Sequence, residues 1–167
     1  MSWVRRSRLI LLGMCILCID QALKCAVYSH FTQHPFHKIC CFYDWLGLSC
    51  FIEYVVNRGA AWGFLSSMQL PLLCVRISLI AVMLVYLFFF RCPQLRHIPL
   101  MMVIGGAIGN VCDFFVYGHV VDMFHFTLLR LSFPVFNIAD TAIFCGLAKL
   151  FMQNFFFKNK RLSTARS

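Results

Sequence analysis

Charged residues are scarce in this sequence of 167 amino acids. They make up 13% of the chain, whereas hydrophobic residues make up 61%, and a typical soluble domain has roughly 25% charged residues. A soluble fold of this length could not cover so much apolar surface with so little charge. The composition therefore excludes an ordinary soluble domain and indicates an integral membrane protein, and the length predicts a single membrane-embedded domain over residues 1–167.

Acidic residues are the scarcest charged type, with six against 15 basic residues. Asp20, Asp113 and Asp140 lie in or at the edge of apolar runs, and Asp122 follows shortly after the third run. A carboxylate in or against a bilayer costs about 2.5–3.5 kcal/mol on insertion scales. We therefore expect these aspartates to have a function.

The motifs of several other hydrolases are absent. The sequence has no paired His and Glu motif for zinc, no Ser–Lys motif and no G-x-S-x-G motif. We therefore expect no metal and no cofactor.

Basic residues give the chain a formal net charge of +9. They cluster beside the apolar runs, at residues 5–8, 91–96 and 158–166. No basic stripe with interleaved aromatic residues lies in a polar segment, so we expect no nucleic-acid partner. Because cytoplasmic flanks of membrane helices are rich in Lys and Arg, these clusters predict that both termini lie in the cytoplasm.

Four apolar segments are long enough to cross a hydrocarbon core, which takes about 20 helical residues. We predict transmembrane helices over residues 9–28, 71–90, 98–117 and 136–157. The N-terminal segment is similar to a signal peptide, but its apolar character continues to Val27 and no small-x-small site follows. We therefore expect an uncleaved first helix, with the two longer connections on the outer side.

The first outer connection contains a segment typical of a strand. Residues 49–56 are rich in β-branched and aromatic residues, and Asn57-Arg58-Gly59 follows as a turn. The predicted fold class is an all-α polytopic membrane protein with four transmembrane helices and a small extracytoplasmic β-cradle in the first outer loop. Cys40, Cys41 and Cys50 also lie in this loop, where a disulfide is left open.

Two polar patterns lie on the predicted helices. Asp20 and Lys24 are four residues apart, so they share a helix face and can form an ion pair; we favour a structural role for them over a catalytic one. Gly106, Asn110 and Asp113 form a second stripe, which we expect to lead to the outer surface.

Asp122 and Asp140 flank the second outer connection. Asn137 and Asp140 alone could simply cap the fourth helix, and Asp122 alone could be a solvated loop residue. Together they are expected to meet in a partly dry cleft, where two carboxyl groups cannot both ionise and share a proton. One can then activate a water as a base while the other polarises a carbonyl as an acid.

Five strings, in this order, resemble the lipoprotein signal peptidase (signal peptidase II) family. They are Asp20-x-x-x-Lys24, Asn57-Arg58-Gly59-Ala60-Ala61-Trp62, Gly105-Gly106-Ala107-Ile108-Gly109-Asn110-x-x-Asp113, Gly118-His119-Val120-Val121-Asp122 and Phe133-Pro134-x-Phe136-Asn137-x-Ala139-Asp140. The resemblance implies an aspartic endopeptidase of the bacterial inner membrane. Such an enzyme removes the signal peptide of diacylglyceryl-modified prolipoproteins, before the lipid-modified cysteine, at the periplasmic face, and is inhibited by globomycin.

The resemblance also implies roles for particular residues. It assigns the catalytic pair to Asp122 and Asp140. The positions that line the substrate pocket carry over to Asn57, Gly59, Asn110 and Asn137, and the supporting positions carry over to Asp20, Lys24 and Asp113.

One position departs from the family pattern, because Phe114 follows Asp113 where the family usually has arginine. The main alternative function is a small proton-coupled transporter, in which buried carboxylates relay protons. A transporter often shows inverted repeats and midplane charges on several helices. Here only the first predicted helix has a midplane charge, and no repeat is visible.

Overall fold

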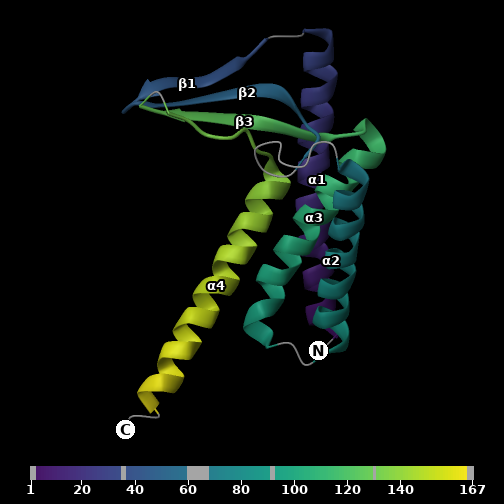
Figure 1. Ribbon diagram of the computed structural model, residues 1–167, viewed down its shortest axis with the longest axis vertical. Helices are drawn as coiled ribbons and strands as arrows, with labels where there is room; N and C mark the ends of the chain where they lie inside the picture. Colours follow the sequence, from purple (N-terminus) through teal and green to yellow (C-terminus); the bar gives the residue numbers. More distant parts are fainter. Residues whose placement is uncertain (1–2, 35–36, 60–67, 91–92, 130, 165–167) are drawn as a thin grey trace.

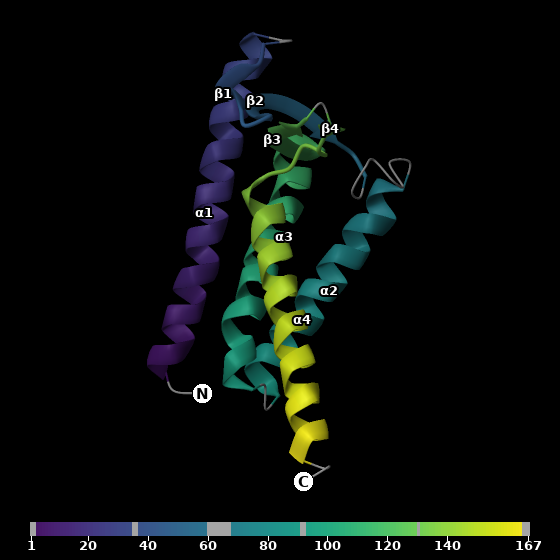
Figure 2. The same cartoon turned by 90° about the vertical axis from the view of Figure 1, so that its left-hand side faces the viewer.

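The computed structural model describes residues 3–34, 37–59, 68–90, 93–129 and 131–164, with side chains described up to residue 155 (Figure 1). Four long helices run alongside one another beneath a small sheet (Figures 1 and 2). The helices are α1 (Trp3–Gln33), α2 (Gln69–Phe89), α3 (His97–Tyr117) and α4 (Ile138–Thr164). A short 3₁₀ turn, η2 (Gln94–Arg96), leads into α3.

Helix α3 is the centre of the bundle and packs against the other three. Two glycines allow this close approach: a Cβ on Gly105 would lie 3.3 Å from Gly13 Cα of α1, and one on Gly106 would lie 2.4 Å from the Ala139 carbonyl oxygen of α4. Small residues at helix contacts are typical of membrane bundles. Helix α4 runs beside α3 (Figure 2) and contacts it far from its N-terminal end as well, where Gln153 donates to the Leu95 carbonyl over 2.9 Å and Arg96 donates to Asn154 over 2.7 Å.

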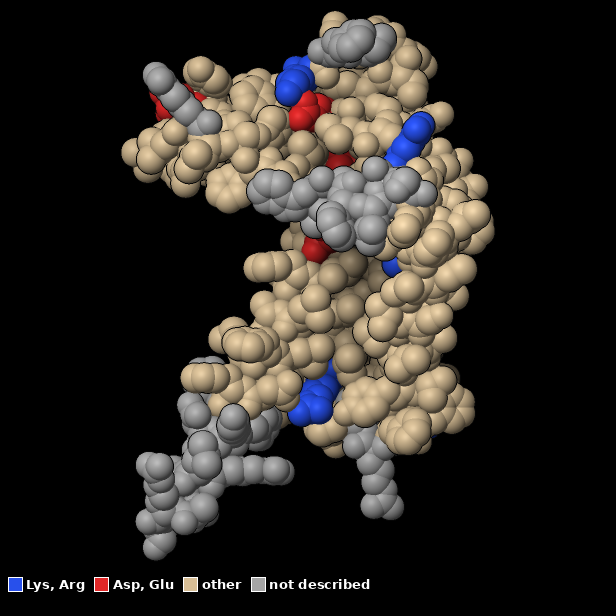
Figure 3. All heavy atoms as spheres, viewed as in Figure 1, with Lys and Arg blue, Asp and Glu red and all other residues tan. Residues whose placement is uncertain are grey.

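The outward surfaces of the helices are apolar. Among the described residues, α1, α2 and the segment Gln94–Tyr117 are long and apolar enough to cross a membrane. On the face shown in Figure 3, uncharged residues cover most of the helices, and acidic side chains gather at the level of the sheet and just beneath it. Large exposed apolar side chains include Ile10, Leu11, Val75, Leu79, Phe144 and Phe151. This is a membrane protein.

The sheet is antiparallel, with strands in the order β1-β2-β3-β4. The strands are β1 (Ile39–Trp45), β2 (Leu48–Asn57), β3 (Val120–Leu128) and β4 (Leu131–Ser132). The strand expected over 49–56 is confirmed as part of β2. However, the expected all-α class with a cradle confined to the first outer loop is wrong in one respect, because β3 and β4 come from the connection between α3 and α4.

The chain reaches β3 through Gly118, which ends α3 in the left-handed conformation at φ 76°. Its N–H bonds to the Phe114 carbonyl, as expected for a helix C-terminal glycine. This turn brings β3 directly above α3, where Val121 and Met123 pack on Val27 and Phe31 of α1. The start of β3 is thereby fixed at the junction between sheet and bundle.

The three cysteines of the connection between α1 and α2 are free thiols. Cys40 and Cys41 in β1 are exposed, and Cys50 in β2 is buried. The disulfide that the sequence left open is therefore not formed in this structure.

Candidate active site

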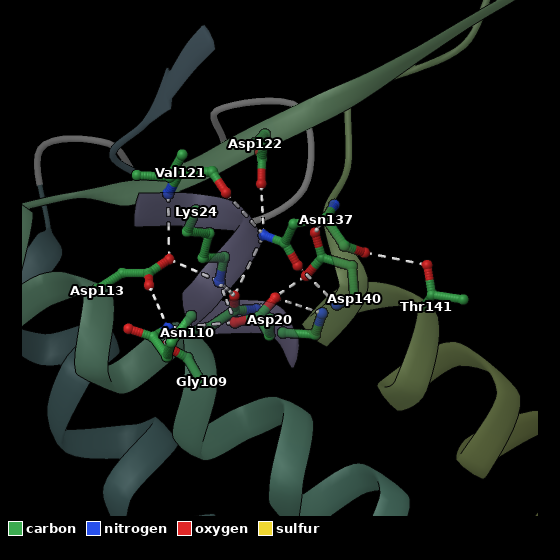
Figure 4. Close-up of polar contacts among 12 residues, drawn as sticks. Asp20, Lys24, Gly109, Asn110, Asp113, Val121, Asp122, Asn137, Asp140 and Thr141 are labelled. Atoms are coloured by element: carbon green, nitrogen blue, oxygen red, sulfur yellow. Dashed lines mark hydrogen bonds and ion pairs between the residues drawn. The ribbon is translucent and has the colours of Figure 1, made fainter. Parts of the chain in front are cut away.

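The two predicted catalytic carboxyl groups meet where β3 approaches the start of α4 (Figure 4). The Asn137 side chain donates from Nδ2 to Asp122 Oδ1 over 2.7 Å, and its Oδ1 accepts a 2.8 Å hydrogen bond from the Asp140 backbone N–H. Asp122 and Asn137 are buried, whereas Asp140 is half-buried. The two aspartates therefore share one amide neighbour, and the site opens on the Asp140 side.

Asn137 and Asp140 also form the cap of α4. Asn137 directly precedes the helix and accepts from the N–H of its third residue, while Asp140 Oδ2 accepts from the Asn137 backbone N–H at 3.3 Å. This is the reciprocal arrangement of a capping box. Asp20 of α1 accepts a further helix N-terminal donor, the Ala139 N–H, at 2.8 Å. The cap that the sequence left open is therefore present, built from the candidate site residues themselves.

Each carboxyl group is held by further amides. Asn57, the last residue of β2, donates from Nδ2 to Asp122 Oδ2 over 2.9 Å. Asn110 of α3 donates from Nδ2 to Asp140 Oδ1 over 2.8 Å. The Gly59 N–H bonds to Asn57 Oδ1 at 3.0 Å, which turns the amide nitrogen of Asn57 toward Asp122. The predicted pocket residues thus surround the carboxyl pair.

Lys24 lies at the centre of a buried network beneath the pair. Its Nζ is 2.7 Å from Asp20 Oδ2 and 2.7 Å from Asp113 Oδ2, and all three side chains are fully buried. It also donates to Asn110 Oδ1 at 3.0 Å. Asp113 Oδ2 accepts the backbone N–H of Val121 at 3.1 Å, next to Asp122. The network therefore connects α1 and α3 to the strand that carries Asp122.

This network confirms one expectation. The ion pair between Asp20 and Lys24 is present, as their helical spacing predicts. The stripe of Gly106, Asn110 and Asp113 runs along α3 toward the sheet, with Gly106 packed on α4 and with Asn110 and Asp113 buried against Lys24. A bilayer gives buried polar groups no water to bond, so they turn to each other.

Burial, and after it the negative charge of Asp140, raise the pKa of Asp122 to about 7. The hydrogen bonds from Asn57 and Asn137 and the positive charge of Lys24 act in the opposite direction. Asp122 is therefore close to half-protonated at neutral pH. A carboxyl pair that holds one proton can supply a base and an acid together.

Sequence reasoning missed Arg76 of α2, whose Nη2 donates to the Gly59 carbonyl at 3.0 Å. The sequence did mark this residue, because Arg76 is the only charged residue in that apolar helix. Sequence reasoning also missed the 2.6 Å hydrogen bond between Tyr54 of β2 and His119, which directly precedes β3. Ala60, Ala61 and Trp62 of the Asn57 string lie outside the described residues.

The fold and the site together define a membrane protein with a pair of carboxyl groups at the junction of a helical bundle and a small sheet. Two solved structures of bacterial membrane enzymes share this fold, with TM-scores of 0.79 and 0.69 at 22% and 24% identity. The first match extends over 92% of this chain and 91% of the solved chain. The second extends over 88% of this chain and 92% of the solved chain.

Similarity in sequence identifies the family. The model of the family described as "Signal peptidase (SPase) II" matches residues 12–156. The lipoprotein signal peptidase of Chlamydia pneumoniae is 34% identical over 96% of this chain and 97% of its own. That of Latilactobacillus sakei subsp. sakei (strain 23K) is 37% identical over 86% of this chain and 90% of its own. The chain belongs to the signal peptidase II family of peptidases.

Proposed function

We propose that this chain is an aspartic endopeptidase that removes the signal peptide from diacylglyceryl-modified prolipoproteins, cutting before the lipid-modified cysteine. Asp122 and Asp140 are its catalytic residues. The observation that carries the proposal is the pair itself: Asn137 donates from its side chain to the Asp122 carboxyl group and from its backbone N–H to the Asp140 carboxyl group, and Asp122 has a pKa of about 7. Family membership supports the class of substrate.

The chemistry follows from one proton shared by the pair. The ionised carboxylate accepts a proton from a water, whose oxygen bonds to the carbon of the scissile carbonyl. The protonated partner donates to the carbonyl oxygen, so charge does not build up on it. The tetrahedral intermediate then collapses as the C–N bond breaks: the leaving amine takes a proton from the pair, and a hydroxyl of the intermediate returns a proton to the pair as the new carboxyl group forms. Asn57, Gly59, Asn110 and Asn137 line the substrate site; the three asparagines hold the carboxyl groups, and Gly59 orients Asn57.

The position of the pair suits a lipid-modified substrate. We infer that α4 is the fourth transmembrane helix, that both termini are cytoplasmic and that the pair lies at the periplasmic face of the bacterial inner membrane. The diacylglyceryl chains can then stay in the bilayer while the peptide reaches the aspartates at the interface. The basic flanks of the helices support this orientation. Globomycin is the expected inhibitor.

The test is cleavage of a purified diacylglyceryl-modified prolipoprotein and of its unmodified precursor. We expect cleavage of the modified form alone. Asp122→Asn and Asp140→Asn should each abolish it while the protein still accumulates in the membrane, because an amide neither accepts the proton of the water nor replaces the acid.

A matched control is Asp44→Asn. Asp44 is an exposed carboxylate of β1 at φ 51°, a conformation that asparagine adopts readily, and it lies away from the pair. This variant should cleave at the wild-type rate. Substantial turnover by either Asp122→Asn or Asp140→Asn would refute the assignment of the catalytic pair.

A further inference from the structure

Arg76 is a charged residue within a membrane-spanning helix. It is the only one in α2, and it lies in the second turn from the outer end, where its side chain is half-buried. A charge at such a position is costly and usually marks a function. The guanidinium donates from Nη2 to the carbonyl oxygen of Gly59 over 3.0 Å. Arg76 therefore contacts the turn that leaves the sheet above the site.

The contact continues to the candidate catalytic pair in two steps. Gly59 is buried, and its N–H donates to Asn57 Oδ1 over 3.0 Å. With that oxygen occupied, Asn57 presents Nδ2 to Asp122 Oδ2 at 2.9 Å. The two sides of Gly59 thus have different partners: the N–H sets the amide of Asn57, and the carbonyl is held by Arg76.

We propose that Arg76 is a positioning residue for the aspartyl pair, which acts by holding the Gly59 carbonyl so that Asn57 donates to Asp122. The inference rests on the proposed function. An arginine suits this task because its guanidinium remains charged and offers several N–H donors in a fixed plane. A hydrogen bond from a charged donor is also stronger than one between neutral groups. The charge lies in α2, outside the buried network of Lys24, so it is an independent support for the site.

A purely structural role predicts a different behaviour. If Arg76 only anchored the outer end of α2, its loss would lower the amount of folded enzyme without changing the folded molecules. If it positions Asn57, the folded enzyme itself is impaired, and Asp122 loses a hydrogen bond that favours its ionised form. Asp140 on α4 and Lys24 on α1 are the charged groups that act on Asp122, and the substitution touches neither.

The experiment compares wild type, Arg76→Met and Arg76→Lys on diacylglyceryl-modified prolipoprotein, with rates expressed per folded molecule. We expect kcat of Arg76→Met to fall about tenfold, the effect of losing one such hydrogen bond, with KM little changed. The alkaline limb of its pH profile should move to higher pH, and Arg76→Lys should recover part of the rate. The matched control is Arg96→Met, which removes an arginine bonded to Tyr86 and Asn154 away from the site, and it should keep the wild-type kcat.

A wild-type kcat and pH profile in Arg76→Met would overturn the inference, as would a loss confined to the amount of folded protein. A second measurement does not depend on turnover. Infrared difference titration of the Asp122 carboxyl band, assigned with Asp122→Asn, should show a higher midpoint in Arg76→Met than in wild type. If wild type cleaves no prolipoprotein, the proposed function fails, and this titration still decides whether Arg76 acts on Asp122; an unchanged midpoint refutes that.

Discussion

Replacing Lys24 by methionine removes the positive charge at the centre of the buried network and keeps an unbranched side chain of similar length. In the structure Lys24 Nζ is 2.7 Å from a carboxylate oxygen of both Asp20 and Asp113, and none of the three side chains is exposed. The variant therefore leaves two carboxylates in a dry interior without their cation.

The expected loss of stability is large. Removing one partner of a buried ion pair costs about 3–5 kcal/mol because the other charge remains buried and uncompensated. Lys24 neutralises two carboxylates, so the upper part of this range applies. The free energy of unfolding of a whole domain is only about 5–15 kcal/mol. We expect most of the Lys24→Met protein to be lost from the membrane.

A second substitution should restore part of the loss. In Asp20→Leu with Lys24→Met, one stranded carboxylate is removed, and Asp113 keeps its hydrogen bonds from Gln21 and the Val121 N–H. Recovery should be incomplete, because Asp20 also accepts the Ala139 N–H. The double variant should therefore be more stable than Lys24→Met and less stable than wild type.

The assay is abundance in the membrane together with the thermal unfolding midpoint in detergent. Lys149→Met is the control, because Lys149 is an exposed lysine on α4; it should behave as wild type. A Lys24→Met protein with the abundance and midpoint of wild type would refute the reasoning. If that protein were also inactive, Lys24 would belong to the catalytic machinery instead.

Three further substitutions test neighbouring features. Asn57→Ala removes a hydrogen bond that lowers the pKa of Asp122. Activity should therefore fall, and the alkaline limb of the pH profile should move to higher pH. An alkaline limb at the same pH as in wild type would contradict this. Gly106→Ala puts a Cβ 2.4 Å from the Ala139 carbonyl oxygen, so the unfolding midpoint should drop clearly, and an unchanged midpoint would mean that α3 and α4 separate freely. Phe114→Arg introduces a charged hydrogen-bond donor, and each hydrogen bond that it makes should contribute about 1.5–3 kcal/mol to binding. Globomycin should therefore inhibit this variant more tightly than wild type. Equal inhibition constants would show that another cation already makes the contact.

Local spacing was enough to predict several features of this site. Asp20 and Lys24 are one helical turn apart, so their pairing follows from helix geometry alone. The strand character of residues 49–56 and the capping pattern of Asn137 and Asp140 are equally local, and the structure contains both. Features of this kind depend on a few consecutive residues, and a sequence displays them directly.

Features that depend on tertiary packing were not predictable in the same way. The second partner of Lys24 is Asp113, and no spacing rule joins residues of α1 and α3. Strand β3 was interpreted as a loop, because Asp122 and His125 interrupt its apolar residues and its stability comes from pairing with β2. Arg76 stands out in the sequence as the only charged residue of α2, but its contact with Gly59 could not be foreseen, because a backbone carbonyl leaves no mark in the sequence.

The cap of α4 and the candidate catalytic site are one structure, and this determines what a substitution there can measure. Asp140 has two tasks: its backbone N–H and one carboxylate oxygen complete the capping box with Asn137, and its other oxygen accepts from Asn110. Asparagine at position 140 keeps the backbone N–H and one side-chain acceptor, so the cap can persist while acid–base chemistry is lost. Alanine at position 137 would remove the cap and the donor to Asp122 together. An inactive Asp140→Asn enzyme that still folds therefore reports on chemistry, whereas an inactive Asn137→Ala enzyme cannot separate chemistry from the start of the helix.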